Sequence, residues 1–178
     1  MEYKMSLDPD RVGVLIGKGG EVKKRIEDLT GCKVDIDTKN GVITIDGDDV
    51  DSVITASNIV KAINLGFSPD KAFILLDPDM NLHIIDVYTL LKKRDENNLR
   101  RVLGRIIGEK GKAKRIIEET TGTHISVYRN YVCIIGDFEG VYMADEAIKM
   151  LAKGLPHRVV YEKLYTMRRA SRGRGEIW

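Results

Sequence analysis

Two short glycine-rich segments, about ninety residues apart, have the composition of turns that bind phosphate. The first reads Gly17-Lys18-Gly19-Gly20 and the second reads Gly108-Glu109-Lys110-Gly111. Because glycine has no Cβ, a phosphate backbone can approach such a turn closely. The helix expected after each turn points unpaired amide hydrogens and the positive end of its dipole at the turn. With a lysine in each tip, the two turns are candidate anion-binding sites.

The spacing of these glycines excludes two common nucleotide-binding motifs. A P-loop has four residues between its first glycine and a Gly-Lys-Ser/Thr triplet. Here three residues separate Gly13 from Gly17, and Lys18 is followed by Gly19 instead of a hydroxyl residue. A dinucleotide fingerprint would need a further glycine at the position of Val22. The turns therefore favour phosphate, and we expect no nucleotide cofactor.

The sequence around the two turns is itself repeated, which indicates one module used twice. Both copies carry an earlier glycine at the same spacing, a later Thr-Gly pair and, further on, a Gly-Asp pair. These landmarks are Gly13 and Gly104, Thr30-Gly31 and Thr121-Gly122, and Gly47-Asp48 and Gly136-Asp137.

Hydrophobic periodicity and turn residues predict the elements that position each turn. The first copy has a strand over 4–7, a short helix up to the turn, a helix over 21–30, hairpin strands over 33–37 and 42–46, and a helix over 50–63. The second copy has strands over 82–87, 124–128 and 131–135, a helix closed by Gly122, and a helix over 141–153. A last helix is predicted over 158–171. We therefore expect an α+β fold with two tandem domains, each a three-stranded antiparallel sheet with helices on one face.

The expected domain boundaries separate two copies of unequal charge. The domains are residues 1–66 and 81–154, joined by a connector with a short helix at 67–80 and followed by a helix and basic tail at 155–178. Residues 1–67 hold nine basic and twelve acidic side chains, and the remaining residues hold twenty and fifteen. Residues 92–115 alone hold ten basic and three acidic side chains. We therefore expect the main polyanion-binding surface on the second copy.

The overall composition is that of a folded protein without metal or disulfides. Of the 178 residues, 43% are hydrophobic and 31% are charged. No apolar run approaches the roughly 20 residues of a membrane span, and the first residues do not resemble a secretion signal. We expect no membrane contact and a cytoplasmic location. Cys32 and Cys133 are interpreted as small buried residues, and the three histidines have no metal-ligand spacing.

The glycine turns and their flanking isoleucines resemble the signature of KH domains. The matching segments are Ile16–Gly20 with Ile26, and Ile107–Gly111 with Ile117. The order of elements also matches the type I KH topology. In that family the Gly-x-x-Gly loop clamps the backbone of about four single-stranded nucleotides. The bases enter a groove beside the adjacent strand. Glu109 is a mild departure from the pattern.

The resemblance implies a non-enzymatic protein that binds single-stranded RNA through residues of both copies. The expected site residues of the first copy are Gly17, Lys18, Gly19, Gly20, Lys23 and Lys24. Those of the second copy are Gly108, Glu109, Lys110, Gly111, Lys112, Lys114 and Arg115. Ile125 and Val127 are expected to flank the bases, although the sequence does not fix which face of their strand meets the groove. Arg129, between Tyr128 and Tyr131, fits either base stacking or cross-strand packing.

The second half of the chain also resembles a narrower group, the archaeal members of the Krr/Pno family of ribosome-assembly proteins. The resemblance rests on Ala144–Ala147, Gly154–Tyr161 and the basic final helix. It implies binding near the 3′ end of small-subunit rRNA during its maturation. It also implies two partners, the endonuclease that trims this end and the α subunit of a translation initiation factor.

The residues themselves leave two other functions open. A protein–protein adaptor would use the repeated domains as a scaffold, in keeping with the acidic first copy. Its partner binding would survive aspartates in both turns, whereas RNA binding would not. An enzyme acting on nucleic acid would need paired carboxylates or a metal cluster near a turn. The sequence shows neither, and metal-dependent cleavage of RNA by the pure chain would be the observation that favours an enzyme.

Overall fold

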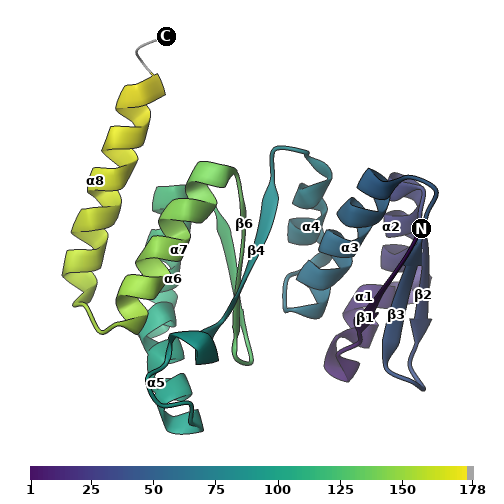
Figure 1. Cartoon of the computed structure of the whole chain (residues 1–178), viewed down its shortest axis with the longest axis horizontal. Helices are drawn as coiled ribbons and strands as arrows, with labels where there is room; N and C mark the ends of the chain where they lie inside the picture. Colours follow the sequence, from purple (N-terminus) through teal and green to yellow (C-terminus); the bar gives the residue numbers. More distant parts are fainter. Residues whose placement is uncertain (176–178) are drawn as a thin grey trace. The chain divides into compact units, whose positions relative to one another are not determined.

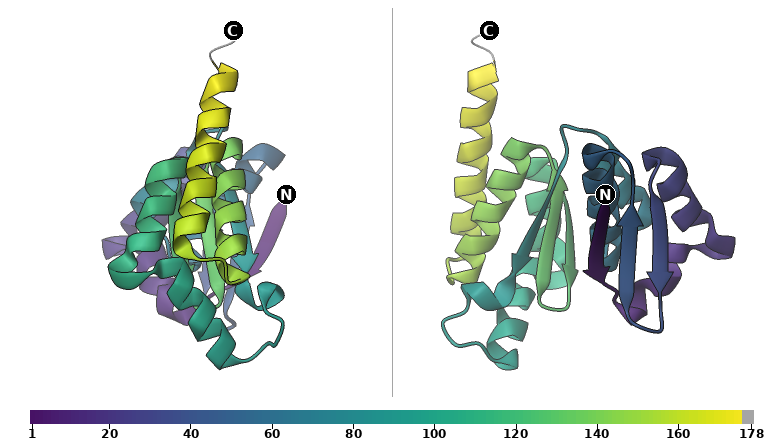
Figure 2. Two further views of the ribbon diagram at one scale, coloured as in Figure 1. Left: turned by 90° about the vertical axis from the view of Figure 1, so that its left-hand side faces the viewer. Right: turned by 45° about the vertical axis from the view of Figure 1, so that its right-hand side comes forward.

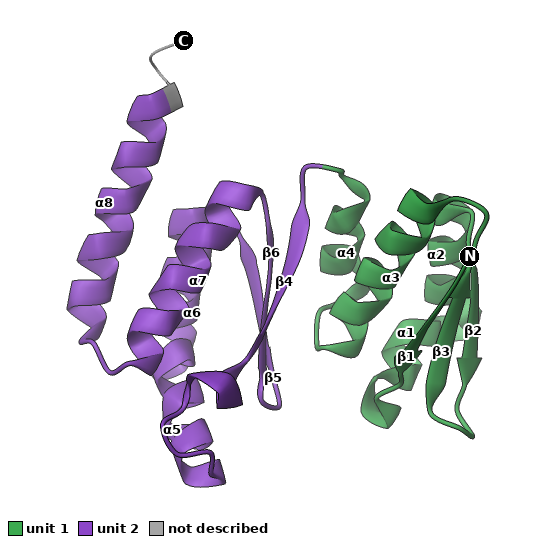
Figure 3. Cartoon of the chain, viewed as in Figure 1, with its two compact units in different colours: residues 1–78 green, residues 79–178 purple. Residues whose placement is uncertain are grey.

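The chain divides into two compact units, Met1–Pro78 and Asp79–Trp178, and the computed structural model describes residues 1–175 (Figures 1 and 3). Each unit contains one antiparallel sheet of three strands with helices packed on one face. The predicted α+β class, with a repeated module and a C-terminal helix, is confirmed. No helix among the described residues is long and apolar enough to cross a membrane.

Unit 1 begins with the edge strand of its sheet and ends with the connector. Its strands are β1 (Glu2–Ser6), β2 (Lys33–Asp37) and β3 (Val42–Asp46), in the order β1-β3-β2. Its α-helices are α1 (Val12–Ile16), α2 (Glu21–Thr30), α3 (Val50–Asn64) and α4 (Pro69–Ala72). Short 3-10 helices are η1 (Pro9–Arg11), η2 (Lys18–Gly20) and η3 (Phe73–Leu76). The first glycine turn is η2, between α1 and α2.

Unit 2 repeats this order and adds a long last helix. Its strands are β4 (Asn81–Asp86), β5 (His124–Tyr128) and β6 (Tyr131–Gly136), in the order β4-β6-β5. Its α-helices are α5 (Glu96–Ile107), α6 (Lys112–Thr121), α7 (Phe138–Ala152) and α8 (His157–Gly175). Its 3-10 helices are η4 (Val87–Leu90) and η5 (Glu109–Gly111). The second glycine turn is η5, between α5 and α6.

Local sequence explains where the helices begin and end. Asp49, Asp95 and Asp137 precede α3, α5 and α7, and each carboxylate accepts a hydrogen bond from an amide in the first turn. Gly31 and Gly122 close α2 and α6 in the left-handed conformation. In unit 2 the helices on both sides of the glycine turn therefore have capped outer ends, at Asp95 and Gly122, whereas in unit 1 only α2 does, at Gly31.

Apolar side chains between the sheet and the helices form the core of unit 2. Ile134 of β6, Ile117 of α6 and Ile148 of α7 are all fully buried there. Helix α8 contributes Val160 and Leu164 to the same core, although it lies outside the repeated module. Figures 1 and 2 show α8 as a third layer over α6 and α7, on the side away from the sheet.

Two details differ from the periodicity analysis. Leu29 follows Val22 and Ile26 at helical spacing, which predicts a buried side chain, but it is 51% exposed and α2 buries only Ile26 completely. Helix α7 begins at Phe138, three residues before the predicted start, since Asp137 caps it. Cys32 and Cys133 are both buried, as expected.

The repeat continues past the last helix of each module. The amide of Phe67 donates to the carbonyl of Ala62, and the amide of Leu155 donates in the same way to Met150. The preceding glycines, Gly66 and Gly154, have φ values of 105° and 93°. The connector elements α4 and η3 therefore follow α3 as the first turns of α8 follow α7.

Candidate nucleic-acid interface

The two glycine turns have nearly identical backbones. Gly17 and Gly108 both have φ 76° and ψ 174°. Gly20 and Gly111 are both left-handed, with φ 80° and 76°. The amide of Gly17 donates to Gly13 at 2.9 Å, and that of Gly108 donates to Gly104 at 2.8 Å. The sequence repeat therefore specifies one turn geometry at two places.

The first glycine of each turn is required by close packing. A Cβ on Gly17 would lie 2.5 Å from Cγ2 and 2.8 Å from the nitrogen of Val22. A Cβ on Gly108 would lie 2.7 Å from both the Cβ and the nitrogen of Ala113. The combination of positive φ and ψ near 180° is also almost restricted to glycine. The missing side chain lets the next helix start directly against the turn.

The last glycine of each turn is open to a ligand. A Cβ on Gly20 or on Gly111 would meet nothing within 4 Å, so only their left-handed φ favours glycine. These residues are the N-caps of α2 and α6, and neither helix has a side-chain cap there. The first amides of α2 and α6 already donate to the carbonyls of Lys18 and Glu109. Each turn therefore offers a ligand open space at its last glycine, next to the positive end of a helix.

The third position of the turn distinguishes the two units. Gly19 has φ 61°, whereas the equivalent residue of unit 2 is Lys110, with φ 52°. Among the described residues, only Lys110 and Arg129 have positive φ without being glycine. An L-residue in this conformation costs about 1 kcal/mol. Unit 2 therefore places a lysine at the tip of its turn in spite of backbone strain.

Most of the predicted cations are exposed and without a partner in the described part of the chain. The exposed side chains that form no hydrogen bond or ion pair within the described part of the chain are Lys18, Lys24, Lys110, Lys112 and Arg115. Two others are engaged within their own helices. Lys114 contacts Glu118 at 2.6 Å, and Lys23 contacts Glu27 at 3.8 Å. The free cations thus surround the turns, and Lys23 and Lys114 are partly neutralised.

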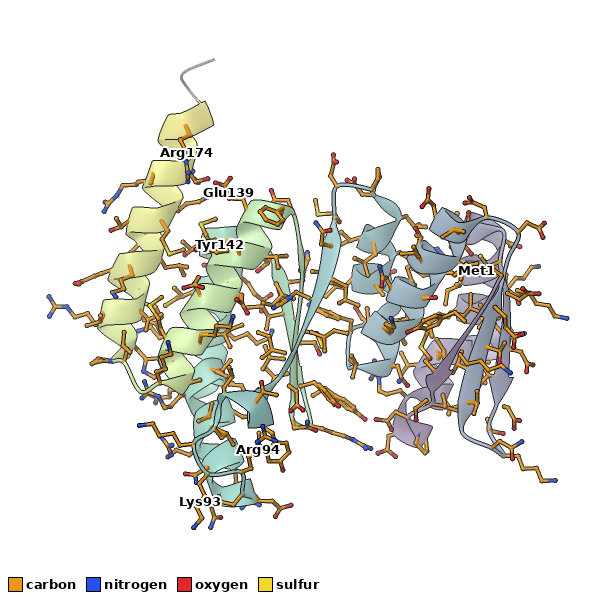
Figure 4. All side chains as sticks on the ribbon, in the orientation of Figure 1. Met1, Lys93, Arg94, Glu139, Tyr142 and Arg174 are labelled. Carbon is orange, nitrogen blue, oxygen red and sulfur yellow. The ribbon has the colours of Figure 1, made fainter. Side chains whose placement is uncertain are left out.

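The basic run over residues 92–115 does not form a single patch. Lys93 and Arg94 precede α5, as Figure 4 shows, while the turn follows the same helix. A helix of 12 residues separates the two ends by about 18 Å. The cations nearest the turn are therefore Lys110, Lys112 and Arg115.

Arg105 lies within the basic run but has a structural role. Its Nε donates to the carbonyl of Leu151 at 3.0 Å, and Nη2 donates to the carbonyl of Leu155. Arg11 does the same in unit 1, at the carbonyls of Ile63 and Phe67, both at 2.8 Å. Both arginines close the C-terminal end of the last module helix, so Arg105 is not a free cation for a ligand.

The prediction that Ile125 flanks the bases is wrong. Ile125 is 2% exposed and belongs to the core beneath the helices, so its side chain does not reach the surface. Val127 lies on the same face of β5, is half-buried and packs against the same core. Side chains alternate along a strand, and the helix-facing set of β5 is the one that had been assigned to the ligand. A role for Val127 stays a prediction.

A hollow beside α5 is a feature that the sequence did not reveal. It has a volume of about 310 Å³ and is lined by Tyr88, Glu96, Leu99, Arg100, Leu103, Arg129 and Asn130. The guanidinium of Arg129 lies 5.4 Å from the ring centre of Tyr128, close enough for a cation–π contact. The only sequence signals for this hollow were Arg100 in the basic run and the Tyr-Arg pair at the hairpin turn.

The histidines take part in local contacts. His83 Nε2 lies 3.0 Å from Oδ1 of Asp145, and Lys149 contacts the other carboxylate oxygen at 2.8 Å. This carboxylate raises the pKa of Lys149. Within residues 1–175, no group of three or more histidine, cysteine, aspartate or glutamate side chains is arranged to hold a metal ion.

Comparison with known proteins agrees with this architecture. The model of the eukaryotic-type KH domain (KH-domain type I) from the second domain of PNO1 matches residues 81–169, and the general KH domain model matches residues 2–62. The chain is 42% identical to the KH domain-containing protein MJ0443 of Methanocaldococcus jannaschii, over 98% of this chain and 78% of that protein. It is 37% identical to the pre-rRNA-processing protein PNO1 of Candida albicans, over 67% of this chain and 43% of the longer relative.

A solved structure extends the comparison to a complex. The chain is similar to the matched protein in the crystal structure of the a/eIF2α–aDim2p–rRNA complex from Pyrococcus horikoshii. The TM-score is 0.88 at 40% identity, covering 96% of this chain and 95% of that one. The resemblance of the two glycine turns to KH domains is therefore confirmed.

Proposed function

Because the chain belongs to the PNO1-type family of proteins with two KH domains, we propose that it binds single-stranded rRNA and assists assembly of the small ribosomal subunit. It acts by holding RNA and not by chemistry on it. The observation that supports this most directly is the pair of open glycine turns, each with free cations around the first amides of a helix. The proposed place of action is the cytoplasm.

The second turn is proposed as the main clamp on the RNA backbone. A phosphate would sit beside Gly111 at the start of α6, where the turn is open and the end of the helix dipole is positive. Lys110, Lys112 and Arg115 would neutralise the phosphates on either side. Glu109 is exposed at the tip and would point into solvent. The first turn, with Lys18 and Lys24 around it, would hold RNA more weakly because unit 1 is acidic.

The hollow beside α5 gives the bases a place to bind. Its walls combine apolar side chains, Leu99 and Leu103, with the guanidinium groups of Arg100 and Arg129. Flat guanidinium groups stack on nucleobases and also donate hydrogen bonds to their edges. Only an unpaired strand can turn a base into such a hollow, which favours single-stranded RNA over a duplex.

The 3′ end of small-subunit rRNA is the proposed target, and the trimming endonuclease a proposed partner. Support comes from the PNO1 relative, which is named for pre-rRNA processing. The Pyrococcus horikoshii complex, which contains a/eIF2α as well as rRNA, supports the α subunit of this initiation factor as a further partner. Because unit 1 has an excess of acidic side chains, it is the better candidate for binding a protein partner. In this form the adaptor function is limited to unit 1, while unit 2 binds RNA.

The test is the affinity for an oligonucleotide with the sequence of the small-subunit rRNA 3′ end, measured at several salt concentrations. We expect log K to fall by about 0.7 per unit of log salt concentration for each phosphate neutralised. The double substitution Glu109→Asp with Lys110→Asp should lower affinity at least about tenfold, or about 1.4 kcal/mol. Aspartate tolerates the left-handed conformation, so the fold should persist. Salt-independent binding, or unchanged affinity of the variant, would place the site elsewhere.

A further inference from the structure

Helix α8 is strongly cationic on the side that does not face the core. Residues 157–175 hold six basic side chains and a single acidic one, Glu162. The exposed cations of this helix are Arg158, Lys163, Arg169, Arg172 and Arg174. Its buried side chains, Val160 and Leu164, belong to the core of unit 2. One side of α8 is therefore fixed to the unit and the other is left to solvent.

Several exposed residues of α8 lie on one stripe. Arg158, Tyr165, Arg169 and Arg172 are spaced at i, i+7, i+11 and i+14, which places them on the same helix face. We call these four residues the arginine stripe. Tyr165 is 45% exposed between the arginines. Glu162, on the same face, pairs with Arg158 at 3.2 Å and leaves the other two arginines without a carboxylate among the described residues.

The start of α8 is anchored close to the second glycine turn. His157 Nε2 lies 2.8 Å from the carbonyl oxygen of Arg105, near the end of α5 and three residues before Gly108. Helix α6 starts at the same turn, and α8 packs against it (Figure 1). The arginine stripe therefore begins beside the proposed clamp and leads away from it.

The length of α8 carries the stripe beyond α6. With 19 residues, α8 is about 28 Å long, whereas the 10 residues of α6 span about 15 Å. At its far end, Arg174 lies 3.8 Å from Glu139 at the start of α7, and Figure 4 labels both residues. The stripe itself, from residue 158 to residue 172, is about 21 Å long. This is room for several phosphates of an extended strand.

Unit 1 does not share this feature. The elements at the equivalent place are α4 and η3, which end at Leu76 and contain one lysine, one aspartate and no arginine. Unit 1 therefore folds without an equivalent of the later turns of α8, of which unit 2 uses Met167 for packing against its core. Packing does not explain the exposed arginines on the opposite side of these turns, Arg169 and Arg172.

We propose that the arginine stripe binds RNA that continues beyond the nucleotides held by the second glycine turn. The inference rests on the proposed function, because it extends the same RNA-binding site. The arginines bind successive phosphates, and Tyr165 stacks on an unpaired base. Arginine with an interleaved aromatic residue is the combination that binds single strands without sequence preference.

The test compares a 5-nucleotide and a 20-nucleotide single-stranded RNA on the full chain. The triple variant Arg158→Gln, Arg169→Gln and Arg172→Gln removes three charges, and glutamine preserves the helix. We expect unchanged affinity for the short RNA, at least tenfold weaker binding of the long RNA at low salt, and a salt slope reduced by about 2. The matched control is Lys4→Gln, Lys33→Gln and Lys39→Gln, which removes three exposed charges from unit 1 and should change neither affinity nor slope by as much.

The outcomes separate this inference from the proposed function. If the triple variant loses the same affinity for both RNAs, or loses none for either, the proposal that the arginine stripe extends the binding site is overturned. If the wild-type chain binds neither RNA, the proposed function fails and the stripe proposal falls with it. Circular dichroism of the triple variant shows whether α8 is intact. If α8 is lost, Tyr165→Ala alone decides: about fivefold weaker binding of the long RNA only supports the stripe, and unchanged binding overturns it.

Discussion

The two units build the same turn with different residues at its tip. Unit 1 has Lys18 in the second position and the flexible Gly19 in the third, whereas unit 2 has Glu109 and then Lys110. The φ angles of the third residues differ by little, 61° and 52°. The geometry is therefore set by the first and last glycines, and the tip residues are free to vary in charge. In unit 2 the cation at the third position, Lys110, has a strained backbone conformation. Backbone strain of this kind is common at functional sites.

The largest expected effect tests whether the first glycine sets this geometry in both units. Gly17→Ala and Gly108→Ala should each lower the free energy of unfolding by about 3 kcal/mol, because the Cβ meets the next helix and the backbone angles suit only glycine. The controls are Gly13→Ala and Gly104→Ala, where a Cβ meets nothing within 4 Å. These should be neutral or stabilising by about 0.5–1 kcal/mol. Chemical denaturation measures all four. If one unit keeps its stability with alanine at the first glycine of its turn, the two turns do not depend on this glycine in the same way.

A second prediction tests the shared role of Arg11 and Arg105. Each holds two carbonyls at the end of its module's last helix, so Arg11→Gln and Arg105→Gln should each cost about 2 kcal/mol of stability. RNA affinity at a temperature where the variants stay folded should change little. Arg101→Gln serves as the control, since Arg101 is exposed and should stay within about 0.5 kcal/mol of wild type. If Arg105→Gln instead causes a large loss of RNA affinity, Arg105 itself contacts the RNA.

The smallest effect concerns the tip itself. Lys110→Gly should stabilise unit 2 by about 1 kcal/mol, and Gly19→Lys should destabilise unit 1 by a similar amount. Affinity should move in the opposite direction, because Lys110→Gly removes one cation and lowers the salt slope by about 0.7. Thermal unfolding and RNA titration of the same samples would show the two signs. If Lys110→Gly leaves affinity intact, the strain at this residue has no part in binding.

The sequence predicted the parts of the fold that local chemistry determines. Glycine spacing, turn residues and apolar periodicity are short-range signals, and they located the turns and most helices within a few residues. The repeat was visible for the same reason. The extension of the repeat into the connector was not visible in the sequence. Helices α4 and α8 occupy equivalent places after α3 and α7, but their sequences have little in common.

The errors have a common physical origin in contacts between distant residues. Alternation in β5 shows that Ile125 and Val127 share a face, but only the packing of α6 and α7 decides that this face is buried. The carbonyls that Arg105 binds lie about fifty residues away in the sequence. The sequence therefore could not distinguish this structural arginine from the other basic residues of the run. The hollow near Arg129 likewise depends on α5 meeting the hairpin turn.

Mapping of RNA crosslinks tests the central claim most directly. The full chain is irradiated with a 4-thiouridine RNA that carries the small-subunit rRNA 3′-end sequence, and the crosslinked peptides are identified by mass spectrometry. The structure predicts that crosslinks concentrate at residues 108–115 and around Arg129, with fewer at residues 17–24. Crosslinks confined to unit 1, or absent from both glycine turns, would contradict the assignment of the second turn as the main RNA clamp.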